Sequence, residues 1–142
     1  MNNTDFHVSL PIRIDWSELD YLGHVNNVSY FKYIQSARVH YFELIGLTEM
    51  YLETRVGAIL LNMSCDFILP LFYPGHIIIQ AGMEFIKNTS FGMKFRILND
   101  KGELAAEAKD VLVMFDYNKN EKIPFPESLK QKIQEIEKRE LR

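Results

Sequence analysis

Hydrophobic and polar positions near the N-terminus alternate first and then change period. Residues 6–16, FHVSLPIRIDW, alternate apolar and polar side chains over most of their length, as a half-buried strand requires. Pro11 cannot donate to a neighbouring strand, so we expect a sheet edge or a bulge there. From about Asn27 to Leu44, apolar residues at helical spacing predict one long helix, with an apolar stripe at Tyr30, Ile34, Ala37, Tyr41 and Ile45. Asn27 is expected to cap this helix and Gly46 to end it.

The rest of the chain changes to strand patterns. After a polar connection at residues 49–55, strands are predicted at 56–69, 76–87, 91–99 and 103–117. The turn-forming segments between these strands are short, which favours antiparallel neighbours. Residues 126–140 place apolar positions at helical spacing in a charged segment, which predicts a short C-terminal helix. The order of elements predicts an α+β fold in a single domain, residues 1–142, with its core at about 6–117.

A single sheet that curls around one helix leaves strand edges unpaired. An exposed edge favours pairing with another chain, and a two-fold axis pairs two copies of the same edge. We therefore expect a homodimer, or a homotetramer if the outer face of the sheet is also covered.

Composition and charge narrow the classes of function. The 142 residues carry 16 Lys and Arg against 19 Asp and Glu, so no overall positive field attracts nucleic acid or an anionic membrane. No apolar run approaches the roughly 20 residues that cross a bilayer. The one cysteine, Cys65, can form no intrachain disulfide, and the residues Met-Asn-Asn-Thr-Asp do not have the pattern expected of a secretory leader. These features predict a soluble, cytoplasmic protein with no nucleic-acid or membrane partner. The spacing of its histidines predicts no metal site.

The most specific stretch joins the first strand to the long helix. It reads Asp20-Tyr21-Leu22-Gly23-His24-Val25-Asn26-Asn27-Val28-Ser29-Tyr30, preceded by Arg13 and Glu18 and followed by Arg38. This stretch resembles the signature of hotdog-fold thioesterases of the 4-hydroxybenzoyl-CoA thioesterase type. The resemblance covers about residues 8–117, including FILP at 67–70, Gly75 before a strand and Ser90-Phe91 at the start of the next. It implies a five-stranded antiparallel sheet wrapped around one long central helix.

The resemblance also implies an activity, acyl-CoA thioester hydrolysis, and a set of catalytic residues. Asp20 takes the place of the catalytic carboxylate, either as general base on water or as a nucleophile that forms a mixed anhydride. The backbone N–H at Asn27 takes the place of the group that polarises the carbonyl. This agrees with the unpaired amides and positive dipole end of any helix start. His24 would either orient substrate and assist proton transfer or satisfy backbone groups in the loop.

Further positions complete the candidate substrate site. Asn26 is expected mainly to stabilise the loop, and Tyr30 to pack in the core with its hydroxyl near the site. Lys87, close to Ser90, is the basic residue left where some relatives cluster cations for the CoA phosphates. Gln35 stands where many relatives carry an acid on the central helix, which places more weight on Asp20. No cofactor is expected.

Other functions stay open at this point. Acyl-carrier-protein thioesterases of plant type share His-Val-Asn-Asn but have Asn where this chain has Leu22, and the acidic chain shows no basic patch for a carrier. A hydratase or dehydratase would use Asp20 with His24. A module that binds acyl thioesters without turnover would keep the fold alone. The sequence leaves the identity of the acyl group open.

Overall fold

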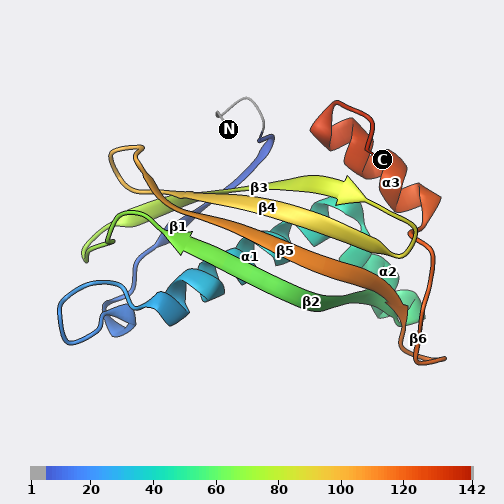
Figure 1. The fold of residues 1–142 in the computed structure, drawn as a ribbon, viewed down its shortest axis with the longest axis horizontal. Helices are drawn as coiled ribbons and strands as arrows, with labels where there is room; N and C mark the ends of the chain where they lie inside the picture. Colours follow the sequence, from blue (N-terminus) through green and yellow to red (C-terminus); the bar gives the residue numbers. More distant parts are fainter. Residues whose placement is uncertain (1–5, 142) are drawn as a thin grey trace.

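The structure, a computed structural model, describes residues 6–141. Its antiparallel sheet curls around the long helix α1 (Asn27–Ile45) (Figure 1). The long strands are β1 (Val8–Arg13), β2 (Val56–Phe67), β3 (His76–Ile86), β4 (Ser90–Leu98) and β5 (Leu104–Asp116). A short strand, β6 (Glu121–Lys122), pairs with the end of β5. This is the predicted hotdog arrangement, in which the sheet wraps around one central helix.

One face of the sheet and one stripe of α1 form the core. Every second residue of β3 and β4 is buried against the helix, and their buried members include Ile77, Ile79, Met83, Phe91, Met93, Phe95 and Ile97. The helix contributes the predicted stripe, since Tyr30, Ile34, Ala37, Tyr41 and Ile45 are all buried. Period-two strands and a helix of period 3.6 thus meet along their apolar sides.

The strand order corrects the prediction that short connections join neighbours. The order is β1-β3-β4-β5-β2, so β2 pairs with β5 and not with β3. Alternation shows which face of a strand is apolar but not which strand lies beside it. Residues 68–75 therefore cross the ends of β5 and β4, and they pass next to the segment that precedes α1. In that contact the N–H of Val25 donates to the carbonyl of Leu71 at 2.9 Å.

Local structure departs from the predictions at three further places. The polar connection at 49–55 is mostly helix α2 (Leu47–Thr54), which follows Gly46 in the left-handed conformation with φ of 86°. The first strand ends at Arg13, because Asp15 caps the short 3₁₀ turn η2 (Trp16–Glu18). The cap of α1 is Asn26, one residue earlier than predicted.

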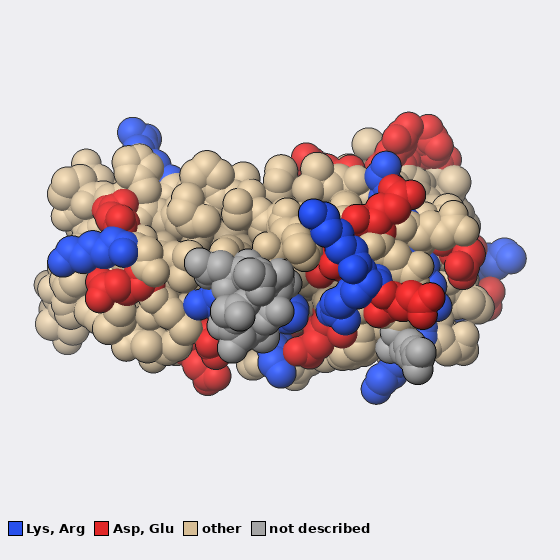
Figure 2. Space-filling view, turned by 90° about the horizontal axis from the view of Figure 1, so that it is seen from above, with Lys and Arg blue, Asp and Glu red and all other residues tan. Residues whose placement is uncertain are grey.

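The predicted C-terminal helix is α3 (Glu127–Glu137). It buries Leu129 and Ile133 and docks beside the end of β3 (Figure 1). On the face shown in Figure 2, acidic and basic side chains mingle at the α3 end, and neither sign forms a patch of its own. Within residues 6–141, no helix is both long enough and apolar enough to span a membrane.

Candidate active site

Residues 19–25 fold into a tight turn that carries Asp20. Leu19 and Val25 pair across this turn, and the N–H of Asp20 donates to the carbonyl of His24 at 2.8 Å. The carboxylate closes the turn through one oxygen, because Oδ1 accepts the N–H groups of Leu22 at 2.9 Å and His24 at 3.2 Å. Gly23 permits the bend with φ of 84°. The turn therefore fixes the conformation of Asp20 through one carboxylate oxygen.

The start of α1 follows this turn directly. Asn26 Oδ1 accepts the N–H of Ser29 at 2.9 Å, and Asn26 Nδ2 donates to the carbonyl of Glu18 at 2.8 Å. Asn26 thus stabilises the loop, as predicted. Asn27 is the first helical residue, and the first amides of a helix have no acceptor within it. These amides and the positive end of the helix dipole form a site for negative charge.

The Asp20 turn and the helix start share one hollow of about 330 Å³. It is lined by Asp20, His24, Val25, Asn27, Tyr30 and residues 67–70. The Tyr30 hydroxyl donates to the carbonyl of Leu69 at 3.3 Å, and its ring meets Phe67 edge-on at 4.9 Å. Burial raises the pKa of Tyr30, so the hydroxyl stays a donor at neutral pH. The imidazole of His24 packs edge-on against Phe72 at 5.1 Å. Asp20, His24, Asn27 and Tyr30 are thus brought together.

Lys87 and Ser90 lie elsewhere in the chain. They belong to the β3–β4 turn, at the end of the sheet near α3, whereas the segment before α1 lies at the opposite end (Figure 1). There the N–H of Lys87 donates to the carbonyl of Ser90 at 2.8 Å, and its ammonium lies 5.0 Å above the ring of Phe85. Within one chain, these two residues do not join the hollow beside Asp20.

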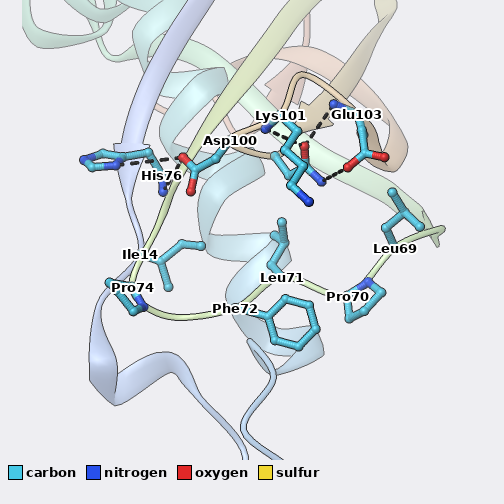
Figure 3. A pocket seen from close by; sticks show the side chains of 11 residues that line it. Ile14, Leu69, Pro70, Leu71, Phe72, Pro74, His76, Asp100, Lys101 and Glu103 are labelled. Carbon is cyan, nitrogen blue, oxygen red and sulfur yellow. Dashed lines mark hydrogen bonds and ion pairs between the residues drawn. The ribbon is translucent and has the colours of Figure 1, made fainter.

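A second hollow of about 350 Å³ lies beside the same crossing segment (Figure 3). Leu69 and Pro70 border both hollows. Ile14, Leu71 and Phe72 give the second hollow an apolar floor, and Lys101 extends toward it from the β4–β5 turn. Asp100 on its rim accepts the N–H of His76 at 3.0 Å. Its polar groups come from exposed turns, so the first hollow, with a carboxylate beside a helix start, is the candidate active site.

Cys65 lies on β2 and is half-buried. Burial, with the nearby Asp66 carboxylate, raises the pKa of its thiol to about 11. The thiolate is the nucleophilic form of cysteine, so this residue is a poor nucleophile at neutral pH.

The pattern of the sequence did not reveal one buried contact of the site. Glu18 accepts a hydrogen bond from the Tyr33 hydroxyl at 2.8 Å, and both residues are buried. The spacing of Tyr33 from Tyr30 places both rings on neighbouring positions of the helix face. That spacing indicates burial of Tyr33 but does not identify its partner.

Comparison with protein families agrees with this geometry. A family model described as the thioesterase-like superfamily matches residues 14–133. The chain belongs to this superfamily. The match supports the resemblance to thioesterases, and the 4-hydroxybenzoyl-CoA type stays a prediction.

Relatives of this thioesterase-superfamily chain include solved structures. A thioesterase from Thermus thermophilus, solved in complex with coenzyme A and Zn, is 26% identical with a TM-score of 0.85, covering 96% of this chain and 98% of that chain. A predicted thioesterase from Bacillus stearothermophilus is 25% identical with a TM-score of 0.82, covering 89% of this chain and 93% of that chain. The uncharacterized protein YsmA of Bacillus subtilis (strain 168) is 23% identical over 100 residues, 70% of this chain and 67% of its own length.

Proposed function

We propose that this protein hydrolyses an acyl-CoA thioester to a free acid and CoA. The observation that carries the proposal is one hollow lined by both the Asp20 carboxylate and the first helical residue, Asn27. Thioester hydrolysis needs an activated nucleophile and a group that stabilises the oxyanion, and these two elements supply both. The similar Thermus thermophilus thioesterase was solved with coenzyme A, which supports a CoA ester as substrate. Such a substrate fits the cytoplasmic location expected from the sequence.

The chemistry follows from the position of these groups. Asp20 either removes a proton from the attacking water or attacks the carbonyl carbon itself. In both routes negative charge develops on the carbonyl oxygen, and the N–H at Asn27 stabilises that charge at the helix start. Collapse of the tetrahedral intermediate breaks the carbon–sulfur bond and releases the CoA thiolate. When water attacks, the acyl group leaves as the free acid; when Asp20 attacks, the acyl group stays on Asp20 as a mixed anhydride, and a water then hydrolyses this anhydride to the free acid and restores the carboxylate.

His24 and Tyr30 form part of the wall of the hollow. Packing against Phe72 holds the His24 imidazole at the edge of the hollow, where we propose that it orients the substrate. The hydroxyl of Tyr30 holds the carbonyl of Leu69 and so shapes the wall that faces the acyl group. Position 35 of α1, where many relatives carry an acid, is the amide Gln35. The assigned chemistry therefore uses one carboxylate, Asp20.

We further propose that the protein is a homodimer that pairs through β2. This strand is an edge of the sheet, and exposed apolar side chains lie along it and just after it, namely Leu60, Leu61, Phe67, Ile68 and Leu69. An edge with such side chains is a template for a second chain. Covering it with a second copy would remove this apolar surface from water.

The same pairing would bring Lys87 and Ser90 to the site. Phe67, at one end of β2, lines the hollow, while Ile59 and Ser90 both pair with Val113 near its other end. An antiparallel two-fold pairing places the start of one β2 beside the end of the other. The β3–β4 turn of the second copy would then approach Asp20 of the first, with Lys87 available for the CoA phosphates.

The test is release of free thiol from short, long and aromatic acyl-CoA esters, measured beside the same acyl groups on a carrier protein. We expect CoA release from at least one ester. Release from the carrier esters alone would instead support a carrier-protein thioesterase. Tight binding of acyl-CoA with no release from any ester would support a binding module, and hydration of an enoyl thioester without release of thiol would support a hydratase.

A further inference from the structure

Glu18 keeps a carboxylate in the interior, next to the Asp20 turn. The residue is only 8% exposed. Its Oε1 accepts the N–H of Asp15 and the hydroxyl of Tyr33, both at 2.8 Å, and its Oε2 lies 3.6 Å from Lys32 Nζ. Burial of a carboxylate is unfavourable unless donors satisfy it. These contacts therefore explain how the charge is tolerated at this position.

Tyr33 connects this carboxylate to the body of α1. Burial and the hydrogen bond to Glu18 raise the pKa of Tyr33, so its hydroxyl remains a donor at neutral pH. The phenol ring itself is buried in the core. The Tyr33–Glu18 contact thus joins the helix to the residue that comes shortly before Asp20 in the chain.

The backbone carbonyl of Glu18 also connects this segment to the cap of α1. Its carbonyl accepts the backbone N–H of Asn26 at 2.9 Å and the side-chain amide of Asn26 at 2.8 Å. Asn26 in turn caps α1 through Ser29. Glu18 is therefore the residue at which the Asp20 turn, the cap and the helix body meet.

We propose that Glu18 is a positioning residue, which holds the Asp20 turn and the start of α1 in one fixed relation. Its effect on rate rests on the hydrolysis proposed above. The hydrogen bonds made by Asp20 lie within its own turn and fix the shape of that turn. The contacts of Glu18 fix where the turn sits against the helix. A displacement of about 1 Å between reacting groups is enough to cost roughly 100-fold in rate.

The same helix provides a matched control. Tyr41, two turns further along α1, donates to Glu137 Oε2 at 2.6 Å, and this carboxylate is also buried. Burial, with the Glu137 carboxylate, raises the pKa of Tyr41 as well. Glu137 lies on α3, away from the Asp20 turn. Replacing either tyrosine by Phe removes one hydroxyl from a buried tyrosine–carboxylate pair, so similar losses of stability are expected.

The experiment compares Tyr33→Phe and Tyr41→Phe with the parent protein by urea unfolding, by steady-state hydrolysis of one acyl-CoA and by amide hydrogen exchange. Only Tyr33→Phe is expected to lower kcat, by roughly 10- to 100-fold, with KM within about threefold of the parent. Glu18→Gln keeps an oxygen that can accept both hydrogen bonds. It should therefore retain most of the kcat that Glu18→Ala loses.

Hydrogen exchange separates this proposal from the proposed function. In Tyr33→Phe, the amides of Leu22, His24 and Asn26 should exchange roughly tenfold faster, and in Tyr41→Phe they should not. This measurement needs no turnover, so a parent protein without thiol release would contradict the proposed hydrolysis alone. Unchanged exchange around Asp20 in Tyr33→Phe, or equal kcat in the two Phe variants, would overturn the positioning role of Glu18.

Discussion

The two halves of α1 use the same chemical pair for different purposes. In the N-terminal half, Tyr33 donates to the buried carboxylate of Glu18, and in the C-terminal half Tyr41 donates to Glu137. Around the first pair the chain stays open, since Tyr21 is 95% exposed and Leu22 is 62% exposed at the tip of the Asp20 turn. A site must leave room for substrate, so hydrogen bonds replace apolar packing as the means of fixing that turn.

The second pair lies in a closed region. Glu137 Oε2 also accepts the N–H of Met83 at 3.2 Å, and Arg139 donates to the carbonyl of Met83 at 2.8 Å. These two side chains bond the backbone of β3 beyond the start of β1, since the first residue of β1, Val8, lies opposite Ala81. With Ile133 0% exposed beside them, this half gains stability from packing and from a covered strand. The proposed site therefore lies in the half of α1 with less apolar cover.

Asp20→Asn should give the largest effect, because it removes the base or nucleophile from the open half. We expect kcat to fall by about 10²- to 10⁴-fold with little change in unfolding. An Asn oxygen can still accept the N–H groups of Leu22 and His24, so the turn should persist. Steady-state kinetics and urea unfolding check both expectations.

Asp116 offers a control with the same turn chemistry at the other end of the molecule. Its Oδ1 accepts the N–H groups of Asn118 at 2.8 Å and Lys119 at 3.2 Å. Asp116→Asn should therefore keep the parent kcat. A similar loss of rate in both variants would show that the effect does not belong to the site.

The ion pair that joins the middle of α1 to β5, Arg38 with Asp110, should affect stability most. Arg38 Nε lies 2.7 Å from Asp110 Oδ2, and both residues are buried. Arg38→Met leaves a buried carboxylate without its cation, which should lower the free energy of unfolding by about 3–5 kcal/mol. Urea unfolding measures this loss, and the double variant Arg38→Met with Asp110→Leu should recover part of it. If Arg38→Met unfolds like the parent, the pair makes no net contribution.

The loss in Arg38→Met should also depend on pH. Burial raises the pKa of Asp110, and Arg38 opposes that rise. Without Arg38 the folded-state pKa lies further above the unfolded value of roughly 3.9. A raised folded pKa gives stability that is full below the unfolded pKa and is lost as pH rises through the folded pKa. The deficit relative to the parent should therefore be small near pH 4 and grow toward pH 7.

Ile133→Ala tests the closed half alone. It opens a cavity under α3, and we expect a loss of about 2–5 kcal/mol in the free energy of unfolding. Because α3 packs far from the Asp20 turn, kcat at a temperature where the variant is folded should match the parent. A large fall in kcat without unfolding would show that the two halves are coupled.

Asn26→Ala should give the smallest loss of stability, about 0.5–2 kcal/mol for a missing helix cap. Unlike Ile133→Ala, it should also lower kcat, because Asn26 ties the start of α1 to Glu18. Thermal unfolding and kinetics on the same preparation separate the two effects. A normal rate with lowered stability would limit Asn26 to a capping role.

The sequence predicted the parts of this fold that follow local periodicity. The stripe of α1 from Tyr30 to Ile45 and the strands β3 and β4 appear as predicted, because periods of 3.6 and two are visible in any window. The pairing of β2 with β5 was not predicted, because alternation carries no information about a distant partner. In the same way, the motif placed Asp20 and Asn27 close together in the sequence, and their catalytic roles stay predictions, but the contact of Glu18 with Tyr33 exists only once the turn folds back onto α1.

The most direct test of the central claim is a crystal structure with an acyl-CoA analogue in which a methylene group replaces the thioester sulfur. We predict that the carbonyl oxygen of the analogue lies about 3 Å from the backbone N of Asn27, with the Asp20 carboxylate facing the carbonyl carbon. An analogue whose carbonyl sits in the second hollow, near Lys101 and away from Asp20, would contradict the account.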